Sequence, residues 1–200
     1  MRQPDGRPEM EKGIAQYHSV VFVRRDSGIR SLQDLTGRVL AFEEGFSSSG
    51  YLLPRISLAE NGVSLAALDS PRAEPPADET GFVFSGDDEN TVEWVLRGHV
   101  DAGAMSHAGL KKRAGDDYSK LEIITRTENI PRHVVSAAPD TSDAFAGALR
   151  TALLHLDQSA PGRDVLKGFE KTAKFDPIPP ETRTMLDHFQ PLVSALIGSN

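Results

Sequence analysis

Short runs of β-favouring apolar residues alternate along this chain with segments whose apolar residues recur every three or four positions. The continuous runs predict strands, and the spaced positions predict helices. The expected strands are 17–24, 38–42, 81–85, 100–105 and 121–125, with 130–135 leading into another. The expected helices are 31–37, 50–60, 91–97, 106–115, 142–156, 161–173 and 181–196. Strands that alternate with helices indicate an α/β fold with a largely parallel sheet.

The most informative stretch is a turn between a predicted strand and a predicted helix. It carries three consecutive hydroxyls, Ser47, Ser48 and Ser49, followed by Gly50 and Tyr51. The first N–H groups of a helix have no partner inside the helix, and the helix dipole adds partial positive charge there. The serines can cap the helix, or they can bind an anion together with those N–H groups. Gly50 would let the backbone approach a ligand closely. The residues alone leave both interpretations open.

A second polar turn follows another predicted strand. Ser85 ends that strand, and the acids Asp87, Asp88 and Glu89 come just after it. Ligands of α/β sheets bind beyond the carboxyl ends of strands, so both turns are candidate positions for a ligand. Asp87 and Asp88 can instead cap the helix that begins near Asn90. We expect no metal site here, because the spacing of the acids matches no calcium loop.

Composition narrows the classes of protein to which the chain can belong. With 200 residues and 26% charged residues, it fits one soluble domain or two small ones. A net charge of −7 argues against a nucleic-acid partner. Residues 1–16 are polar and contain Pro and Gly, so we expect a flexible lead-in and no signal peptide. No apolar run approaches the ~20 residues of a transmembrane helix.

Catalytic chemistry is not expected either. The six histidines are scattered, without the paired spacing of a zinc site. The turn is not the G-x-S-x-G nucleophile elbow of hydrolases, because Ser49 stands where the second glycine would be needed. The sequence therefore favours a binding protein with no cofactor over an enzyme.

Several segments together resemble the phosphate-, phosphite- and phosphonate-binding proteins of ABC importers. The matching stretches are YHSV (17–20), DSGI (26–29), SLQDLTG (31–37), AFE (41–43), SSSGYLLP (47–54), FSG (84–86) and GHVDAGA (98–104). The order of these parts makes the likeness specific, and it covers roughly residues 17–140. The resemblance implies a type 2 periplasmic-binding-protein fold, in which two α/β lobes are joined by two crossing strands and close over a ligand.

The resemblance also implies roles for parts of the chain. The serine–glycine turn binds phosphonate oxygens in that family, and an aromatic residue at the position of Tyr17 lines the cleft. The implied ligand-binding residues are Tyr17, Ser47, Ser48, Ser49, Gly50, Tyr51, Ser85, Asp87 and Asp88. The implied division is a complete lobe over 38–115, with 17–37 and 116–200 forming the crossing strands and a partial lobe with C-terminal helices.

Two departures from the family pattern shape the expectations. The family begins with an N-terminal segment that is missing here, and an incomplete lobe would expose edges and apolar surface that invite pairing with a second copy. Asp87, Asp88 and Glu89 also stand where the family commonly has a histidine. Carboxylates repel a phosphonate unless they are protonated or paired with a cation. A ligand with a positive group, such as an aminoalkylphosphonate, would satisfy both the serines and the acids.

By resemblance we expect the solute-binding component of an ABC-type importer. It would be periplasmic, bind a phosphonate or related small oxyanion, and have a membrane permease as its partner. Two alternatives remain open at this stage. One is a sensory module of the same fold, and the other is a truncated fragment that binds no ligand and forms oligomers.

Overall fold

The computed structural model describes residues 16–132, 134–169 and 172–197. The described residues form two compact units, one containing 16–132 and 190–197 and the other containing 134–169 and 172–189. The predicted lead-in lies outside the described residues, except for Gln16, which opens the first strand. The division into lobes at 38–115 stays a prediction.

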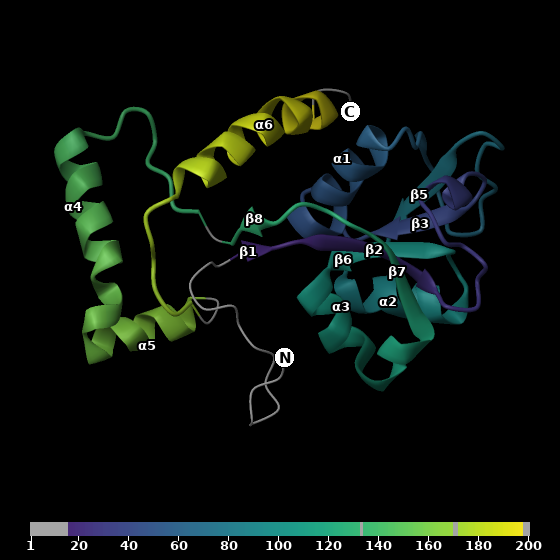
Figure 1. Cartoon of the computed structure of the whole chain (residues 1–200), viewed down its shortest axis with the longest axis horizontal. Coiled ribbons are helices and arrows are strands. Elements are labelled where there is room, and N and C mark those ends of the chain that lie inside the picture. The colour runs from purple at the N-terminus through teal and green to yellow at the C-terminus, as the bar shows by residue number, and fades with distance from the viewer. Residues whose placement is uncertain (1–15, 133, 170–171, 198–200) are drawn as a thin grey trace. The chain divides into compact units, whose positions relative to one another are not determined.

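The first unit is built on one six-stranded sheet in the order β4-β5-β3-β6-β2-β7 (Figure 1). The strands are β2 (Ser19–Arg24), β3 (Val39–Phe42), β4 (Leu65–Ala67), β5 (Thr80–Phe84), β6 (Ala102–Ser106) and β7 (Leu121–Arg126). A separate antiparallel ribbon joins β1 (Gln16–Tyr17) to β8 (Ile130–Pro131). The α/β class is confirmed. The prediction of a largely parallel sheet is wrong for β2, which runs antiparallel to both of its neighbours.

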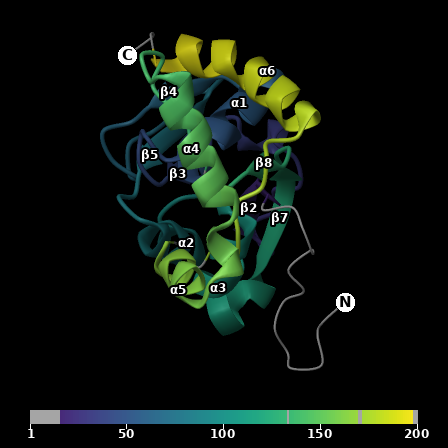
Figure 2. The same ribbon diagram turned by 90° about the vertical axis from the view of Figure 1, so that its left-hand side faces the viewer.

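Helices cover both faces of this sheet (Figures 1 and 2). One core lies on the side of α1 (Leu53–Glu60), and the other on the side of α2 (Asp88–Arg97) and α3 (His107–Ala114). Alternate residues of β2 serve the two cores, since Val21 belongs to the first and Phe22 to the second. A strand buried on both faces reads as a continuous apolar run, which is why this segment was predicted correctly.

Local hydrogen bonds explain where the helices differ from their predicted bounds. Residues 31–37 form a single 3₁₀ turn, η1 (Gln33–Leu35), because the Asp34 carboxylate accepts the N–H groups of both Arg30 and Ser31. The turn after β3 is a π-type turn, η2 (Ser48–Leu52), that continues into α1. Strand β4 was not predicted from the sequence.

The second unit contains helices and has little buried apolar surface among its described residues. Its elements are α4 (Asp143–Leu154), η4 (Leu156–Gln158) and α5 (Ala160–Gly168), and α6 (Pro180–Ile197) begins in this unit. The helices predicted over 142–156 and 181–196 are confirmed to within a few residues. The helix predicted over 161–173 ends at Gly168, and the strand expected over 130–135 ends at Pro131. Phe145 of α4 is 62% exposed, while Leu166 of α5 is buried. No helix among the described residues is long and apolar enough to cross a membrane.

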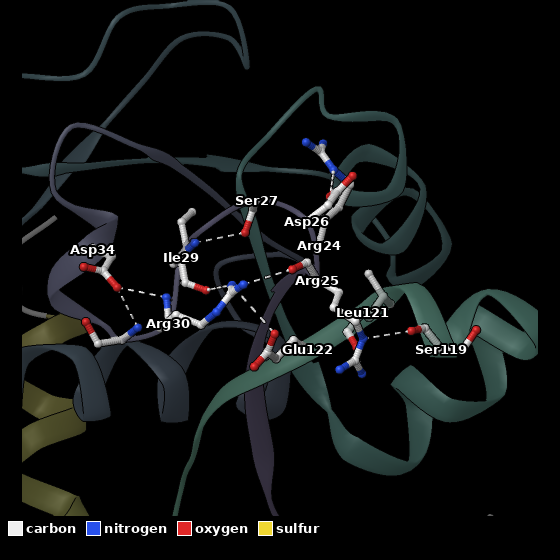
Figure 3. Close-up of polar contacts among 11 residues, drawn as sticks. Arg24, Arg25, Asp26, Ser27, Ile29, Arg30, Asp34, Ser119, Leu121 and Glu122 are labelled. Atoms are coloured by element: carbon white, nitrogen blue, oxygen red, sulfur yellow. Dashed lines mark hydrogen bonds and ion pairs between the residues drawn. The ribbon is translucent and has the colours of Figure 1, made fainter.

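Arginines gather at the end of the sheet where β2 ends and β7 begins (Figure 3). The Arg25 side chain donates to the carbonyls of Ser119 and Leu121, at 3.1 Å in each case. Arg30 forms an ion pair with Glu122, with 3.7 Å between Nη1 and Oε2, and donates to the Arg25 carbonyl. These bonds hold β2 and β7 together at the edge opposite to the predicted ligand site.

Candidate ligand site at the strand ends

The two predicted turns lie at the same edge of the sheet. β5, β3 and β6 are neighbours and run parallel, so their carboxyl ends meet there. β2 begins at this edge and β7 ends at it, because β2 is antiparallel to both β6 and β7. The two turns also bond to each other, since the Ser85 N–H donates to the Phe42 carbonyl (2.8 Å) and the Gly86 N–H to the Glu43 carbonyl (3.0 Å).

Ser47 is the cap of the helix start. Its Oγ accepts the N–H of Gly50 at 2.9 Å and donates to Oε2 of Glu43 at 2.6 Å. The capping interpretation is therefore confirmed for this residue, and its hydroxyl is already engaged. The bond to Glu43 also brings a carboxylate into the turn, which the sequence analysis had not included among the site residues.

Ser48 faces the crossing segment. Burial raises the pKa of Tyr17, and the nearby Ser48 hydroxyl and the charge of Arg132 oppose that shift. Two of the predicted site residues therefore lie close together. Ser48 is exposed and Ser49 is half-buried. The N–H groups of these two residues stand in the first turn of the helix, where no partner exists within the helix.

Gly50 and Tyr51 pack the turn against the core. A Cβ on Gly50 would lie 2.5 Å from Cβ of Glu43 and 2.9 Å from Oγ of Ser47, so only glycine fits. The Tyr51 ring is buried edge-on against Phe42, with 5.1 Å between centroids. Its hydroxyl accepts a hydrogen bond from Arg55 of α1. A contact of Gly50 or Tyr51 with a ligand stays a prediction.

In the second turn, Ser85 and Asp87 hold the start of α2. The Ser85 hydroxyl is buried and bonds to the carbonyls of Phe42 (3.1 Å) and Asp87 (3.0 Å) and to the hydroxyl of Thr91. Oδ1 of Asp87 accepts the N–H of Asn90 at 2.6 Å, which is the predicted cap. Both side chains have structural roles, and a role of either one in ligand binding stays a prediction.

Asp88 differs from these two residues in its electrostatics. Burial raises its pKa to about 6, and the nearby carboxylates of Glu43, Glu89 and Asp87 add to this shift. Arg113 opposes it and forms an ion pair with Glu89. A carboxyl with this pKa is partly protonated near neutral pH and can then donate a hydrogen bond to an anion.

A basic group at the other end of the same edge was not predicted from the sequence. Arg126 ends β7, and its guanidinium contacts the imidazoles of His18 and His107. Scattered histidines gave no signal in the sequence, because their proximity depends on the pairing of β2 with β6 and β7. Among the described residues, no group of three or more His, Asp or Glu side chains could hold a metal ion.

Comparison with known proteins finds one matching family and several similar solved structures. Residues 3–182 match the family model described as ABC transporter, phosphonate, periplasmic substrate-binding protein. XAC2383 from Xanthomonas citri, solved bound to ATP, is 30% identical with a TM-score of 0.87, and the match covers 94% of this chain and 69% of that one. PhnD1 from Prochlorococcus marinus, solved with methylphosphonate, is 21% identical with a TM-score of 0.60, covering 90% and 68%. The latter likeness supports the type 2 periplasmic-binding-protein fold.

Proposed function

Because the chain belongs to the family of periplasmic substrate-binding proteins of ABC phosphonate transporters, we propose that it binds a phosphonate or related small oxyanion at the strand-end edge. Members of this family bind solutes and are not enzymes. The observation that supports the proposal is the exposed side chain of Ser48 in the first turn of η2, close to Tyr17. The anion would accept hydrogen bonds from the N–H groups of Ser48 and Ser49 and from these hydroxyls.

Family membership implies a membrane permease as the partner and a periplasmic location for the proteins it describes. For this chain, we propose that closure of the two lobes around the ligand is the signal that a permease reads. Pairing with a second copy stays a separate prediction, which sedimentation of the ligand-free and ligand-bound protein would check.

A first test uses methylphosphonate, the ligand solved with the Prochlorococcus protein, and isothermal titration calorimetry. Ser48→Ala is expected to weaken binding about tenfold to a hundredfold, because a hydrogen bond to a charged group contributes about 1.5–3 kcal/mol. Ser57→Ala, half-buried in α1, is the matched control and should bind like the wild type. Equal affinities for Ser48→Ala and wild type would remove Ser48 from the site.

A second test concerns the charge of Asp88. Asp88→Asn is expected to bind methylphosphonate about tenfold more tightly than wild type at pH 8, because a close carboxylate repels the anion. The ratio of the two affinities should approach one at pH 5, since the wild-type pKa of about 6 leaves most of this carboxyl protonated there. Using the ratio removes the titration of the ligand itself.

Asp78→Asn removes the same charge from the exposed loop between β4 and β5 and serves as the control. The free energy of unfolding of the wild type should also depend on the charge of Asp88 over the same pH range. The raised pKa of Asp88 means that its contribution to stability is complete below the ordinary value of 3.8 and is lost as the pH rises through about 6. A ratio that does not change between pH 5 and pH 8 would show that Asp88 lies away from the anion. Tighter binding of an aminoalkylphosphonate than of methylphosphonate would instead mean that ionised Asp88 contacts a cationic group.

A further inference from the structure

The basic group at the strand-end edge is a hydrogen-bonded cluster of Arg126, His18 and His107. Nη1 of Arg126 lies 3.2 Å from Nε2 of His18 and 3.0 Å from Nδ1 of His107. Those two imidazole nitrogens are 3.1 Å apart. The residues come from β7, from the junction of β1 with β2, and from the first position of α3. The cluster therefore lies at the same end of the sheet as the serine turn, on the side of α3.

A bulge in β7 aims Arg126 at this cluster. Phe22 of β2 pairs with Ile123, whereas the preceding Val21 pairs with Thr125, so β7 contains one extra residue. Strict alternation would place Arg126 on the face opposite to Ile123. The extra residue reverses the alternation and puts Arg126 on the same face as Ile123, which is the side of α3. Bulges of this kind often re-aim a side chain next to a functional site.

The contacts determine where the protons of the cluster lie. A guanidinium only donates hydrogen bonds, so both imidazole nitrogens that face Arg126 must present lone pairs. His18 then carries its proton on Nδ1 and donates to Oδ1 of Asn129 at 3.1 Å. His107 carries its proton on Nε2 and donates to the hydroxyl of Tyr118 at 3.1 Å.

Arg126 keeps donors available for a ligand. Its Nε and Nη2 form no hydrogen bond with any residue in the described part of the chain, and the side chain is exposed. It lines a hollow together with Tyr118 and Ile123, and this hollow extends along β7 to Leu121 and Arg25. Glu122 lines the same hollow but forms an ion pair with Arg30. A free guanidinium edge matches the two oxygens of a carboxylate or phosphoryl group.

We propose that Arg126, His18 and His107 form a second anion-binding position, which selects ligands that carry a second acidic group, and that filling it takes up one proton. The proposal rests on the proposed function, because it adds a contact to the same ligand. When a second acidic group draws Arg126 toward itself, the two facing lone pairs lose their donor. One proton from solvent then bonds to Nδ1 of His107, which donates it in a hydrogen bond to Nε2 of His18.

The electrostatics around His107 agree with this exchange. Burial lowers the pKa of His107 to about 4, and the charges of Arg126, Lys111 and His18 contribute to the shift. Tyr118 and His18 are its other polar neighbours, and Asn129 is the neutral neighbour of His18. An anion at Arg126 offsets the largest of those charges, so the bound state holds a proton at a pH where the free state does not.

The test compares two probes by calorimetry at pH 6. Methylphosphonate has one acidic group and reports on the serine turn, whereas phosphonoacetate has two. Arg126→Gln is expected to weaken phosphonoacetate binding about tenfold or more while leaving methylphosphonate within about twofold. Arg97→Gln is the charge-matched control, because it removes an exposed arginine at the C-terminus of α2, away from the strand-end edge. Titration in buffers with different ionisation enthalpies should show one extra proton taken up with phosphonoacetate, and none in His107→Gln.

Each outcome supports or overturns either the second anion-binding position or the proposed function. Equal effects of Arg126→Gln on both probes, or no effect on either, would overturn the second position while leaving the proposed function intact. Absence of the extra proton would overturn its proton linkage. Binding of phosphonoacetate alone, with loss in Arg126→Gln, would support the second position and overturn the proposed role of the serine turn. Binding of neither probe would overturn both proposals.

Discussion

Replacing Phe42 by alanine is expected to lower the free energy of unfolding of the first unit by about 3–5 kcal/mol, the usual cost of deleting a buried phenylalanine ring. Phe42 is fully buried at the end of β3. Its ring packs edge-on against Tyr51 and Phe82, with centroids 5.1 and 5.5 Å away. The substitution would therefore leave a cavity beneath the serine turn, where the surrounding rings have little freedom to fill it.

Urea denaturation followed by the fluorescence of Trp94, the single tryptophan, measures this change within the first unit. Phe46→Ala provides the matched control, because Phe46 lies in the same turn but is 82% exposed. It should shift stability by less than about 0.5 kcal/mol. A loss in Phe42→Ala as small as that in Phe46→Ala would mean that the ring does not contribute to the core.

Most of the fold could be predicted because each buried strand has its own local signal. The run that includes Val20 and Phe22 is apolar throughout because both faces of β2 are covered. The direction of β2 had no such signal, since strand pairing depends on contacts between residues far apart in sequence. The short strand β4 was missed for a related reason, because Leu65 and its neighbours are only partly buried and give a weak pattern.

The candidate site was predictable in part. The family resemblance and the hydroxyl-rich turn led to Ser47, Ser48 and Ser49, and a role of these residues in ligand binding stays a prediction. The sequence could not indicate that the Ser47 hydroxyl donates to Glu43. Helix caps and anion-binding residues are of the same types, so the two roles look alike in a sequence. The position of the Arg126 side chain could not be predicted from the sequence, because it depends on a β-bulge that strict alternation does not predict.

The largest effect on binding is expected from Gly50→Ala. The added Cβ would lie 2.5 Å from Cβ of Glu43 and 2.7 Å from its Oε2, so the backbone of the turn must move. Overpacking of this kind costs about 1–3 kcal/mol in stability. The same displacement would disturb the Ser47 cap and the N–H groups of Ser48 and Ser49. Methylphosphonate affinity should then fall on the order of a hundredfold, equivalent to about 2.7 kcal/mol.

Gly147→Ala separates this steric effect from the general consequences of replacing glycine. Gly147 lies in α4 with no atom within 4 Å of the place a Cβ would occupy. Alanine there should raise helix stability by about 0.5–1 kcal/mol and leave methylphosphonate affinity unchanged. Calorimetry and urea denaturation of both variants measure the two quantities. If Gly50→Ala bound methylphosphonate as tightly as Gly147→Ala, the anion could not be held by the amides of this turn, because those amides cannot keep their positions when the Cβ is added.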